Sequence, residues 1–485
     1  MSNQSQFYYP SGGEFMPPTL LEWLEKGTRP RAKLKSVHED FVVEEQGLCG
    51  TRFTINTTSD LSADQVANPP QPTGFIRVTM VKRGLMTSHA ESLLRARLRE
   101  AGYDVKISYA GNKDRTGCTA QGMVIQGTNG NTVPLEAVLK LCRPHELNGR
   151  DWFIKDPIYV QAPLSIGGLA ANWFRVRLVV PGMNATQISS YLQEKVQLLA
   201  EKGYRYPHVY GNQRRGRCQN NDLLGYAFLT LGPQAAFKLC LTMGASDESP
   251  FAKAIRAALA ESWAGFEEAQ ARGATLDEQY SYFVDMHHIL TNGLDRMRWH
   301  EHPREPVHVR VNMPIEYAIV NTAAKTRCLY EVAMTHRRDC SMWVGAIQAY
   351  WYNQALARVL RGEIVLPEGM TSIPLLVNKE KALRFYGQYF PEALPGDYNR
   401  KKQHLFRLDN RVSRKYFQPY NDGPERQLFA EVSHLQYKVS NEEVVFENML
   451  PPGTYETTLL SMFFDINSDY NNGEGGAFIA VETED

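Results

Sequence analysis

One aspartate, Asp114, stands in a short polar segment, Tyr109–Gln121 (YAGNKDRTGCTAQ), where glycines and small polar residues crowd it. Glycine leaves a neighbouring carboxylate accessible and lets another backbone approach closely. The adjacent Lys113 and Arg115 favour the ionised carboxylate, which suits a nucleophile or a charge stabiliser better than a general acid. By itself a K-D-R triplet is more often a solvated turn, so its surroundings must decide between these two interpretations.

The elements that must position Asp114 follow from hydrophobic periodicity. Residues 75–84 alternate as a strand with Ile76, Val78 and Met80 inward. Residues 87–102 carry an apolar stripe typical of a helix, with a predicted capping box between Ser88 and Glu91. Further strands are predicted at 105–109 and 123–126, so Asp114 is expected in the loop between two strands.

Along the whole chain the pattern changes twice. Strands are also predicted at 40–45 and 172–180, helical periods dominate from about Gly225, and a strand pattern returns at 439–450. This order is typical of an α+β domain that carries an insertion. We expect a catalytic domain built from residues 1–206 and 436–485, with an inserted domain at residues 207–435.

The composition restricts the class of protein. The 485 residues include 53 Lys plus Arg and 53 Asp plus Glu, so the chain is no polycation, and any nucleic-acid surface must be local. The seven cysteines form no C-x-x-C pair, which favours a reducing compartment over a disulfide framework or zinc ribbon. With no secretory signal and no apolar run long enough for a membrane span, we predict a cytoplasmic protein that engages no membrane.

The Asp114 segment resembles the G-x-K-D-(K/R)-x-x-x-T-x-Q signature of the TruD family of RNA pseudouridine synthases. Five more segments resemble blocks of that family in the same order, from about Leu34 to Leu460: LKSVHEDFVVEE (34–45), ANWFRVRL (171–178), PHVYGNQRRG (207–216), GAIQAYWYN (345–353) and PPGTYETTLL (451–460). Chance does not account for six ordered blocks, so the chain is identified as a divergent member. Its departures, such as Ala171, Arg215 and Glu456, leave the target uridine open.

The resemblance implies a fold and a reaction. The fold would be a pseudouridine-synthase catalytic domain with a mixed, mainly antiparallel sheet, plus an inserted α/β TRUD-type domain rich in helices. The reaction would isomerise one uridine, expected in tRNA, by breaking its N1–C1′ bond and joining C5 to C1′. It would need no cofactor and no metal, and Asp114 would be the catalytic carboxylate, by a nucleophilic or a glycal route.

The resemblance also implies which residues bind the substrate. The target base must leave its stack, and Phe174 would stack on it while Asn172 holds the base or the aspartate loop. The other substrate-binding residues would be Lys35, Phe41, Lys113, Arg115, Tyr210 and Tyr455, and the RNA backbone would contact Arg214, Arg215 and Arg217. From their patterns alone, Phe41 and Phe174 suit the apolar faces of strands and a role in the core.

Three functions stay open at this point. The first is a pseudouridine synthase acting as a monomer on RNA, either tRNA or another RNA, with no DNA partner. The second is a non-catalytic RNA-binding relative with the same fold. The third is a hydrolase of nucleosides or glycosides, which is disfavoured because the Asp114 segment offers no second carboxylate.

Overall fold

The computed structural model describes residues 14–34, 36–68, 70–128, 131–216, 218–245, 248–292, 313–376, 380–393 and 425–466. The chain divides into two compact units. We call Leu21–His208 with Phe429–Asp485 the sheet unit, and Met1–Leu20 with Val209–Leu428 the helical unit.

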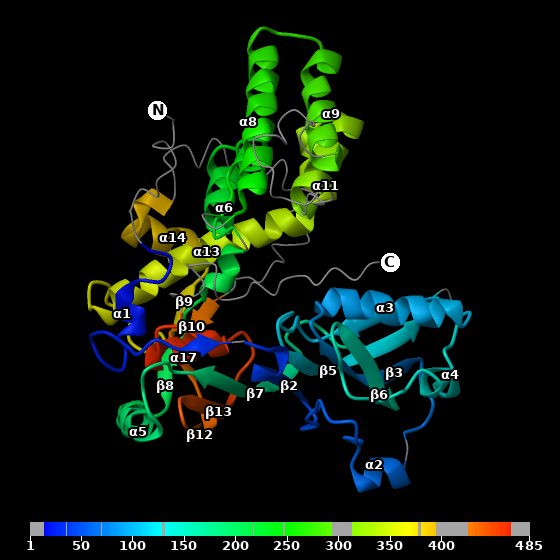
Figure 1. The fold of residues 1–485 in the computed structure, drawn as a ribbon, viewed down its shortest axis with the longest axis vertical. Helices are drawn as coiled ribbons and strands as arrows, with labels where there is room; N and C mark the ends of the chain where they lie inside the picture. The colour runs from blue at the N-terminus through cyan, green and yellow to red at the C-terminus, as the bar shows by residue number, and fades with distance from the viewer. Residues whose placement is uncertain are drawn as a thin grey trace. The chain divides into compact units, whose positions relative to one another are not determined.

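The sheet unit is built on a nine-stranded sheet (Figure 1). Its main path runs β12-β13-β7-β2-β5-β3-β6, with β1 paired to β7 and β4 paired to β5. The pair β2–β5 is parallel, and the other pairs in this sheet are antiparallel. This confirms the predicted α+β class with a mixed, mainly antiparallel sheet. The strands are β1 (Lys33–Leu34), β2 (Phe41–Gly47), β3 (Phe75–Arg83), β4 (Val105–Tyr109), β5 (Cys118–Gly127), β6 (Asp151–Val160), β7 (Leu169–Val179), β12 (Ser433–Ser440) and β13 (Glu443–Leu450).

Two helices cover one face of this sheet, which we call the site face. At the β3 end, Ile76, Val78 and Met80 pack in one buried cluster with Ala90 and Leu94 of α3 (Thr87–Glu100). At the β13 end, the sheet packs against α17 (Glu456–Phe463), where the ring centroids of Phe446 and Phe463 lie 5.8 Å apart. The predicted helix is confirmed, but the predicted capping box is wrong: Met86 is the N-cap and no side chain caps the helix.

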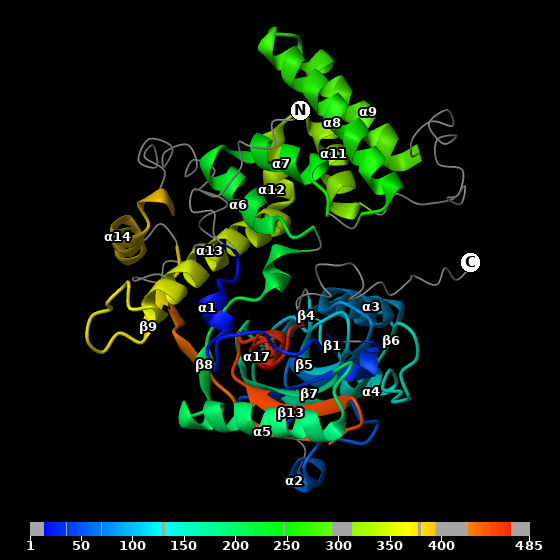
Figure 2. The ribbon, with the colours of Figure 1, turned by 60° about the vertical axis from the view of Figure 1, so that its left-hand side comes forward.

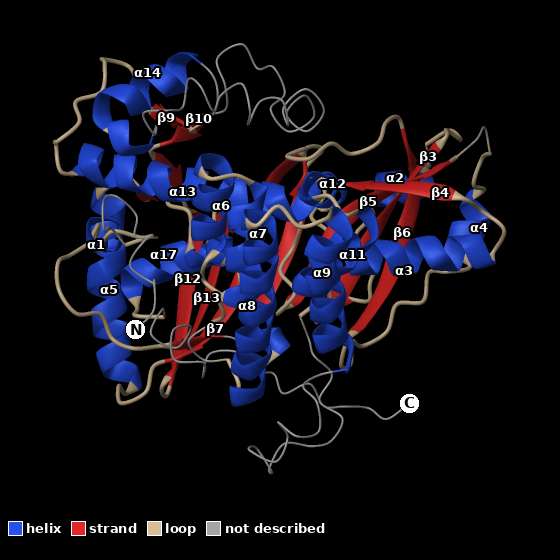
Figure 3. Ribbon diagram, turned by 90° about the horizontal axis from the view of Figure 1, so that it is seen from above, coloured by secondary structure: helices blue, strands red, loops and turns tan. Residues whose placement is uncertain are grey.

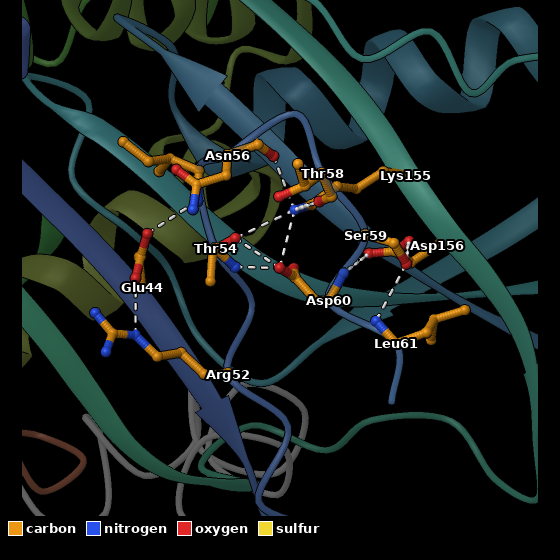
Figure 4. A network of polar contacts seen from close by, with 11 residues as sticks. Glu44, Arg52, Thr54, Asn56, Thr58, Ser59, Asp60, Leu61, Lys155 and Asp156 are labelled. Carbon is orange, nitrogen blue, oxygen red and sulfur yellow. Dashed lines mark hydrogen bonds and ion pairs between the residues drawn. The ribbon is translucent and has the colours of Figure 1, made fainter. Parts of the chain in front are cut away.

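The opposite face of the sheet is also covered. A small buried cluster there joins Val81, Ala120 and Phe153 to Phe53, which precedes a long loop. That loop is fixed by the buried Lys155 of β6, whose Nζ donates to Asn56 O (2.8 Å) and Thr58 O (2.7 Å) and pairs with Asp60 Oδ1 (3.0 Å; Figure 4). Strand β3 is therefore buried on both faces rather than on one.

The remaining elements of the sheet unit lie around this core. Helix α5 (Ala185–Glu201) runs alongside the β12–β13 end (Figure 2), and the Tyr191 hydroxyl donates to Phe463 O. The segment that leaves the unit and the segment that returns to it pair as two short antiparallel strands, β8 (Arg205–Pro207) and β11 (Phe429–Glu431). The short helices are α2 (Ala63–Ala67) and α4 (Leu135–Leu139), and α1 (Pro18–Leu21) lies where the two units meet in sequence.

Helices form most of the described part of the helical unit. Helices α8 and α9 lie side by side, with α11 next to α9 (Figures 1 and 3), and their buried core includes Trp263, Phe266 and Phe283. Within the described ranges, none of the helices combines the length and the hydropathy that a membrane span requires. The elements are α6 (Asn221–Thr230), α7 (Pro233–Thr242), α8 (Pro250–Ala271), α9 (Leu276–Asn292), α11 (Pro314–Thr326), α12 (Leu329–Thr335), α13 (Arg337–Leu360), α14 (Glu380–Tyr389) and the strand pair β9 (Ser372–Pro374) and β10 (Glu425–Gln427).

Candidate active site

Asp114 lies in the loop between β4 and β5, as expected, and it is partly exposed. The loop passes very close to the start of β2. A Cβ atom on Gly117 would stand 2.5 Å from the carbonyl oxygen of Phe41, so only glycine fits there without a shift. Gly84 N also donates to Gly117 O at 3.3 Å. The loop is thus pressed against the sheet rather than free in solvent.

Two buried side chains hold the first half of the loop. Gln121 of β5 is fully buried, and its Nε2 donates to Gly111 O at 3.0 Å. The Thr87 hydroxyl, at the start of α3, accepts from Lys113 N at 2.8 Å and donates to Gln121 Oε1 at 3.1 Å. The Thr87 hydroxyl, in the first turn of α3, is therefore bound to the aspartate loop, while the N-cap residue Met86 has no side-chain oxygen with which to cap the helix.

The Lys113 side chain points into the protein. Its ammonium forms an ion pair with the Glu45 carboxylate of β2, and the two side chains are only 5% and 1% exposed. Glu45 Oε1 also accepts from Gly122 N at 3.3 Å. A buried pair with an added hydrogen bond is costly to break, since either partner alone would be an uncompensated buried charge. Lys113 therefore fastens the loop to β2 in this structure.

A second buried lysine, Lys82, extends from strand β3 of the sheet to the backbone of the same loop. Lys82 Nζ donates to the carbonyl oxygens of Leu85 (2.7 Å) and Asp114 (2.8 Å), with Lys113 O at 3.5 Å. Burial lowers the pKa of this ammonium to about 7, against the opposing attraction of Asp114. Lys82 was not among the residues predicted from sequence.

Phe41 and Phe174 lie side by side on the site face and are 2% and 9% exposed. Their ring centroids are 6.0 Å apart at an interplanar angle of 68°, an edge-to-face arrangement. Because Gly117 contacts Phe41, the aromatic pair and the Asp114 loop are neighbours. Asn172, two residues before Phe174, has a buried Oδ1 with no hydrogen-bond partner among the described residues.

The strand register places these side chains on two adjacent rows of the site face. The first row crosses the sheet from β3 to β13 through Lys82, Thr119, Val43, Phe174 and Asn448. The next row contains Glu45 opposite Asn172, with Gln121 in the neighbouring strand. Polar groups from five strands therefore share the region between α3 and α17, which is unusual for the middle of a sheet face.

At the β13 end of the first row, Asn448 Nδ2 donates to Glu456 Oε1 at 2.8 Å, and both residues are almost fully buried. Burial raises the pKa of the Glu456 carboxyl to about 8, partly offset by the Asn448 bond. Glu456 opens α17, and Tyr455 is the partly buried N-cap residue before it. The predicted Tyr455 therefore directly precedes Glu456, which contacts Asn448 on the site face.

Basic side chains surround the outer edge of the loop. Arg115 is exposed, and with Arg83 and Arg150 it lies near enough to His38 to act on it electrostatically. Burial lowers the pKa of His38, and the three guanidinium groups lower it further while Glu39 opposes them. This edge of the sheet unit offers cationic groups beside Asp114.

The predicted Tyr210, Arg214 and Arg215 belong to the helical unit. The Tyr210 ring has the Arg426 guanidinium 3.9 Å and the Arg214 guanidinium 5.2 Å from its centroid. Arg215 Nε pairs with the buried Asp222 at 3.1 Å. Within the helical unit, two arginines, Arg426 and Arg214, therefore lie against the Tyr210 ring, while Arg215 is held by Asp222.

Two predicted residues, Lys35 and Arg217, lie outside the described residues. Sequence reasoning missed two others, Lys82 and Glu45, although a signal for both was present. Each is in phase with the inward-facing residues of its strand, Lys82 with Met80 and Glu45 with Phe41. A charged residue in phase with an apolar stripe indicates a buried charge, and buried charges gather at functional sites.

The chain resembles known proteins in sequence and in fold. The family model of tRNA pseudouridine synthase D (TruD) matches residues 24–372. Among curated proteins, none matches the chain. The fold is similar to the crystal structure of a Methanosarcina mazei protein assigned as a tRNA pseudouridine synthase D, with a TM-score of 0.52 and 16% identity. That likeness covers 92% of this chain and 96% of the other.

The fold is therefore that of a pseudouridine synthase, an isomerase that acts on RNA. Since the family match spans most of the sequence, the chain belongs to the TruD family.

Proposed function

We propose that this protein converts one uridine of a tRNA to pseudouridine, with Asp114 as the catalytic carboxylate. The observation that carries the proposal is the way the Asp114 loop is held. Thr87, Gln121 and Lys82 bind its backbone from three directions, while the aspartate itself stays partly exposed. Catalytic groups need this kind of fixed support, because small displacements from the productive geometry are costly.

Asp114 would act at the ribose carbon of the target uridine. The N1–C1′ bond breaks, the uracil rotates, and C5 bonds to C1′ before the proton on C5 leaves. A carboxylate beside the sugar can attack C1′ or remove the proton from C2′, the nucleophilic and glycal routes respectively. Both routes use the same carboxylate, and Asp114 is the acidic residue that the loop presents.

The flipped uracil would stack on Phe174, with Phe41 and Tyr455 completing an aromatic wall. The buried Asn172 Oδ1 supports this placement, since it is an acceptor with no partner in the described residues. A uracil N3–H group, or a donor of the aspartate loop, could supply the missing bond and recover the cost of burying that oxygen.

The RNA backbone would be held by cationic side chains. Arg115 beside the aspartate would contact phosphate near the target nucleotide, and Arg214 and Arg215 are proposed to do so in the helical unit. Lys35 is proposed to bind the substrate, and Arg217 is proposed to contact the RNA backbone. Lys113 would support substrate binding indirectly, because its ammonium is bound to Glu45.

Tritium release from tRNA that carries 5-tritiated uridine tests this proposal. We expect release with the wild type and none with Asp114→Asn, which keeps the size of the side chain and removes its charge. Asp104→Asn is the matched control, because Asp104 is exposed at the start of the same hairpin and pairs only with Arg99 in the described structure. Release by Asp114→Asn would overturn the assignment of the catalytic residue.

The same assay separates the other candidate functions. Release from total RNA but not from tRNA would indicate another RNA as substrate. Tight binding of tRNA without release would indicate a non-catalytic RNA-binding protein of this fold.

We further propose a role for each of the two units, together with the compartment and the oligomeric state of the protein. The sheet unit would be the catalytic domain and the helical unit the inserted RNA-binding domain. The protein would work as a cytoplasmic monomer on RNA rather than DNA. Light scattering and a competition experiment with duplex DNA would test the last two statements.

A further inference from the structure

Lys82 is a cation with no exposed surface, and nothing in the proposed reaction uses it directly. An isolated ammonium in the protein interior is very unfavourable, so its donors must be satisfied. Its place on β3, in phase with Val78 and Met80, points it to the site face beneath the Asp114 loop. A methionine or leucine at this position would continue the apolar stripe.

The three donors of the ammonium have three backbone carbonyl oxygens within reach. Two belong to the loop, Asp114 O at 2.8 Å and Lys113 O at 3.5 Å, and the third is Leu85 O at 2.7 Å. Leu85 lies in the turn that leads from β3 to α3. Lys82 thus ties three structural elements together at the residue proposed to do the chemistry.

We propose that Lys82 is a positioning residue for the pseudouridylation reaction, whose ammonium fixes the backbone of Asp114 and hence the approach of its carboxylate to the sugar. This inference rests on the proposed function of Asp114. It assigns Lys82 a role in the rate of the chemical step and none in tRNA affinity.

The charge of Lys82 is set by its surroundings. Burial lowers the pKa of Lys82 to about 7, Asp114 and the Cys118 thiol of β5 raise it, and Lys113 lowers it. A neutral lysine has two N–H donors instead of three, so one carbonyl bond is lost as the pH rises through about 7. The advantage that Lys82 gives to the rate should therefore shrink from about pH 6 to about pH 9.

The same sheet supplies a matched control in Lys155. It is also buried, and its ammonium also binds two backbone carbonyl oxygens, those of Asn56 and Thr58, but on the opposite face (Figure 4). The loop that Lys155 holds is not the loop that carries Asp114. Loss of stability is common to both lysines, and loss of catalysis should be specific to Lys82.

The experiment measures single-turnover rates and tRNA dissociation constants for Lys82→Met and Lys155→Met. We expect the Lys82→Met rate to fall by about 10- to 100-fold at an unchanged dissociation constant, and the Lys155→Met rate to stay within about twofold of wild type. If Lys82→Met cannot be obtained folded, Lys82→Gln, which keeps two N–H donors, should show the same selective fall in rate.

Three results would overturn the inference while leaving Asp114 as the catalytic residue. They are a wild-type rate in folded Lys82→Met, an equal loss of rate in both lysine variants, or a wild-type to Lys82→Met ratio that does not change with pH. An inactive wild type would instead remove the proposed function itself.

Discussion

Several side-chain oxygens on or beside the site face are buried without a hydrogen-bond partner in the described structure. They are Thr119 Oγ1, Asn172 Oδ1, Asn448 Oδ1, Glu456 Oε2 and Thr458 Oγ1. Each such atom costs about 1–3 kcal/mol, so several of them on or beside one sheet face are expensive unless a ligand or water satisfies them. Four of these residues are at most 2% exposed, whereas Asn172 is partly exposed, so Asn172 is the one of the five that a substrate can reach directly.

A first prediction separates binding from folding at Asn172. Asn172→Ala should leave the free energy of unfolding unchanged or slightly higher, because it removes a buried oxygen that has no partner. The value of kcat/KM should fall about 10- to 100-fold through the lost substrate contact. Asn448→Ala is the comparison, since it deletes the bond to Glu456 and should lower stability. Denaturant unfolding beside tritium release measures both effects.

A second prediction concerns the buried pair of Lys113 and Glu45. Lys113→Met or Glu45→Gln alone should lower the free energy of unfolding by about 3–5 kcal/mol, because each leaves the other charge buried and unpaired. The double variant should lose clearly less than the sum of the two. If instead the two losses simply add, the side chains do not interact as the structure has them.

The strand at 75–84, the helix at 87–102 and the loop that holds Asp114 were all predicted from periodicity, which reports burial directly. The positioning contacts were not predictable, because Gln121, Thr87 and Lys82 meet the loop only after the strands pair.

Long-range pairing also explains the Lys113 side chain. Sequence neighbours placed its charge beside Asp114, whereas strand β2 brings Glu45 to it from far along the chain. Similarly, nothing in the local pattern of residues 443–450 reveals that Asn448 will lie opposite Phe174. Local periodicity therefore predicted the elements that flank Asp114, but it missed β6 and α5, and the strand expected at 439–450 is two strands, β12 and β13. The register of the mixed sheet decided the site.

The start of α17 gives a third prediction, on pH dependence. Folding raises the pKa of Glu456 to about 8, so the folded state holds a proton that the unfolded state releases above about pH 4.5. The stabilisation that protonated Glu456 gives the folded state is therefore lost as the pH rises from about 4.5 to about 8. Glu456→Gln keeps an acceptor for Asn448 and should raise the free energy of unfolding by about 1–3 kcal/mol near pH 7.

The measurement is thermal unfolding of both proteins from about pH 4.5 to about pH 8. The gap between wild type and Glu456→Gln should widen steadily over this range. A constant gap would mean that Glu456 does not change its proton affinity on folding.

The chain passes between the two units at Leu20–Leu21, His208–Val209 and Leu428–Phe429, and the last two crossings adjoin the paired strands β8 and β11, which form the connection to the inserted segment. The strands β8 and β11 pair directly, with Tyr206 opposite Ala430, so the chain leaves and re-enters the sheet unit at neighbouring points. Insertions whose ends lie close together are readily removed or exchanged.

The net charge of the chain is zero, so RNA is attracted by local groups of arginines rather than by the whole surface.

A fourth prediction follows from this connection. A shortened chain that starts at Leu21 and joins His208 to Phe429 through a few glycines should fold cooperatively by itself. Circular dichroism and urea unfolding would show one transition with mixed α and β content. A shortened chain that is unfolded, while the full chain is stable, would mean that the sheet unit depends on the helical unit.

The same connection sets an order of events on the ribosome. Strands β12 and β13 and helix α17 complete the sheet beside β7, yet they are synthesised only after all of Val209–Leu428. At 5–20 residues per second the nascent sheet waits on the order of tens of seconds with the β7 edge unpaired. During that time the exposed edge is open to wrong pairing. Folding of the helical unit before residues 429–450 are made would hold the ends of the insertion close together, so that β13 reaches the β7 edge soon after its synthesis.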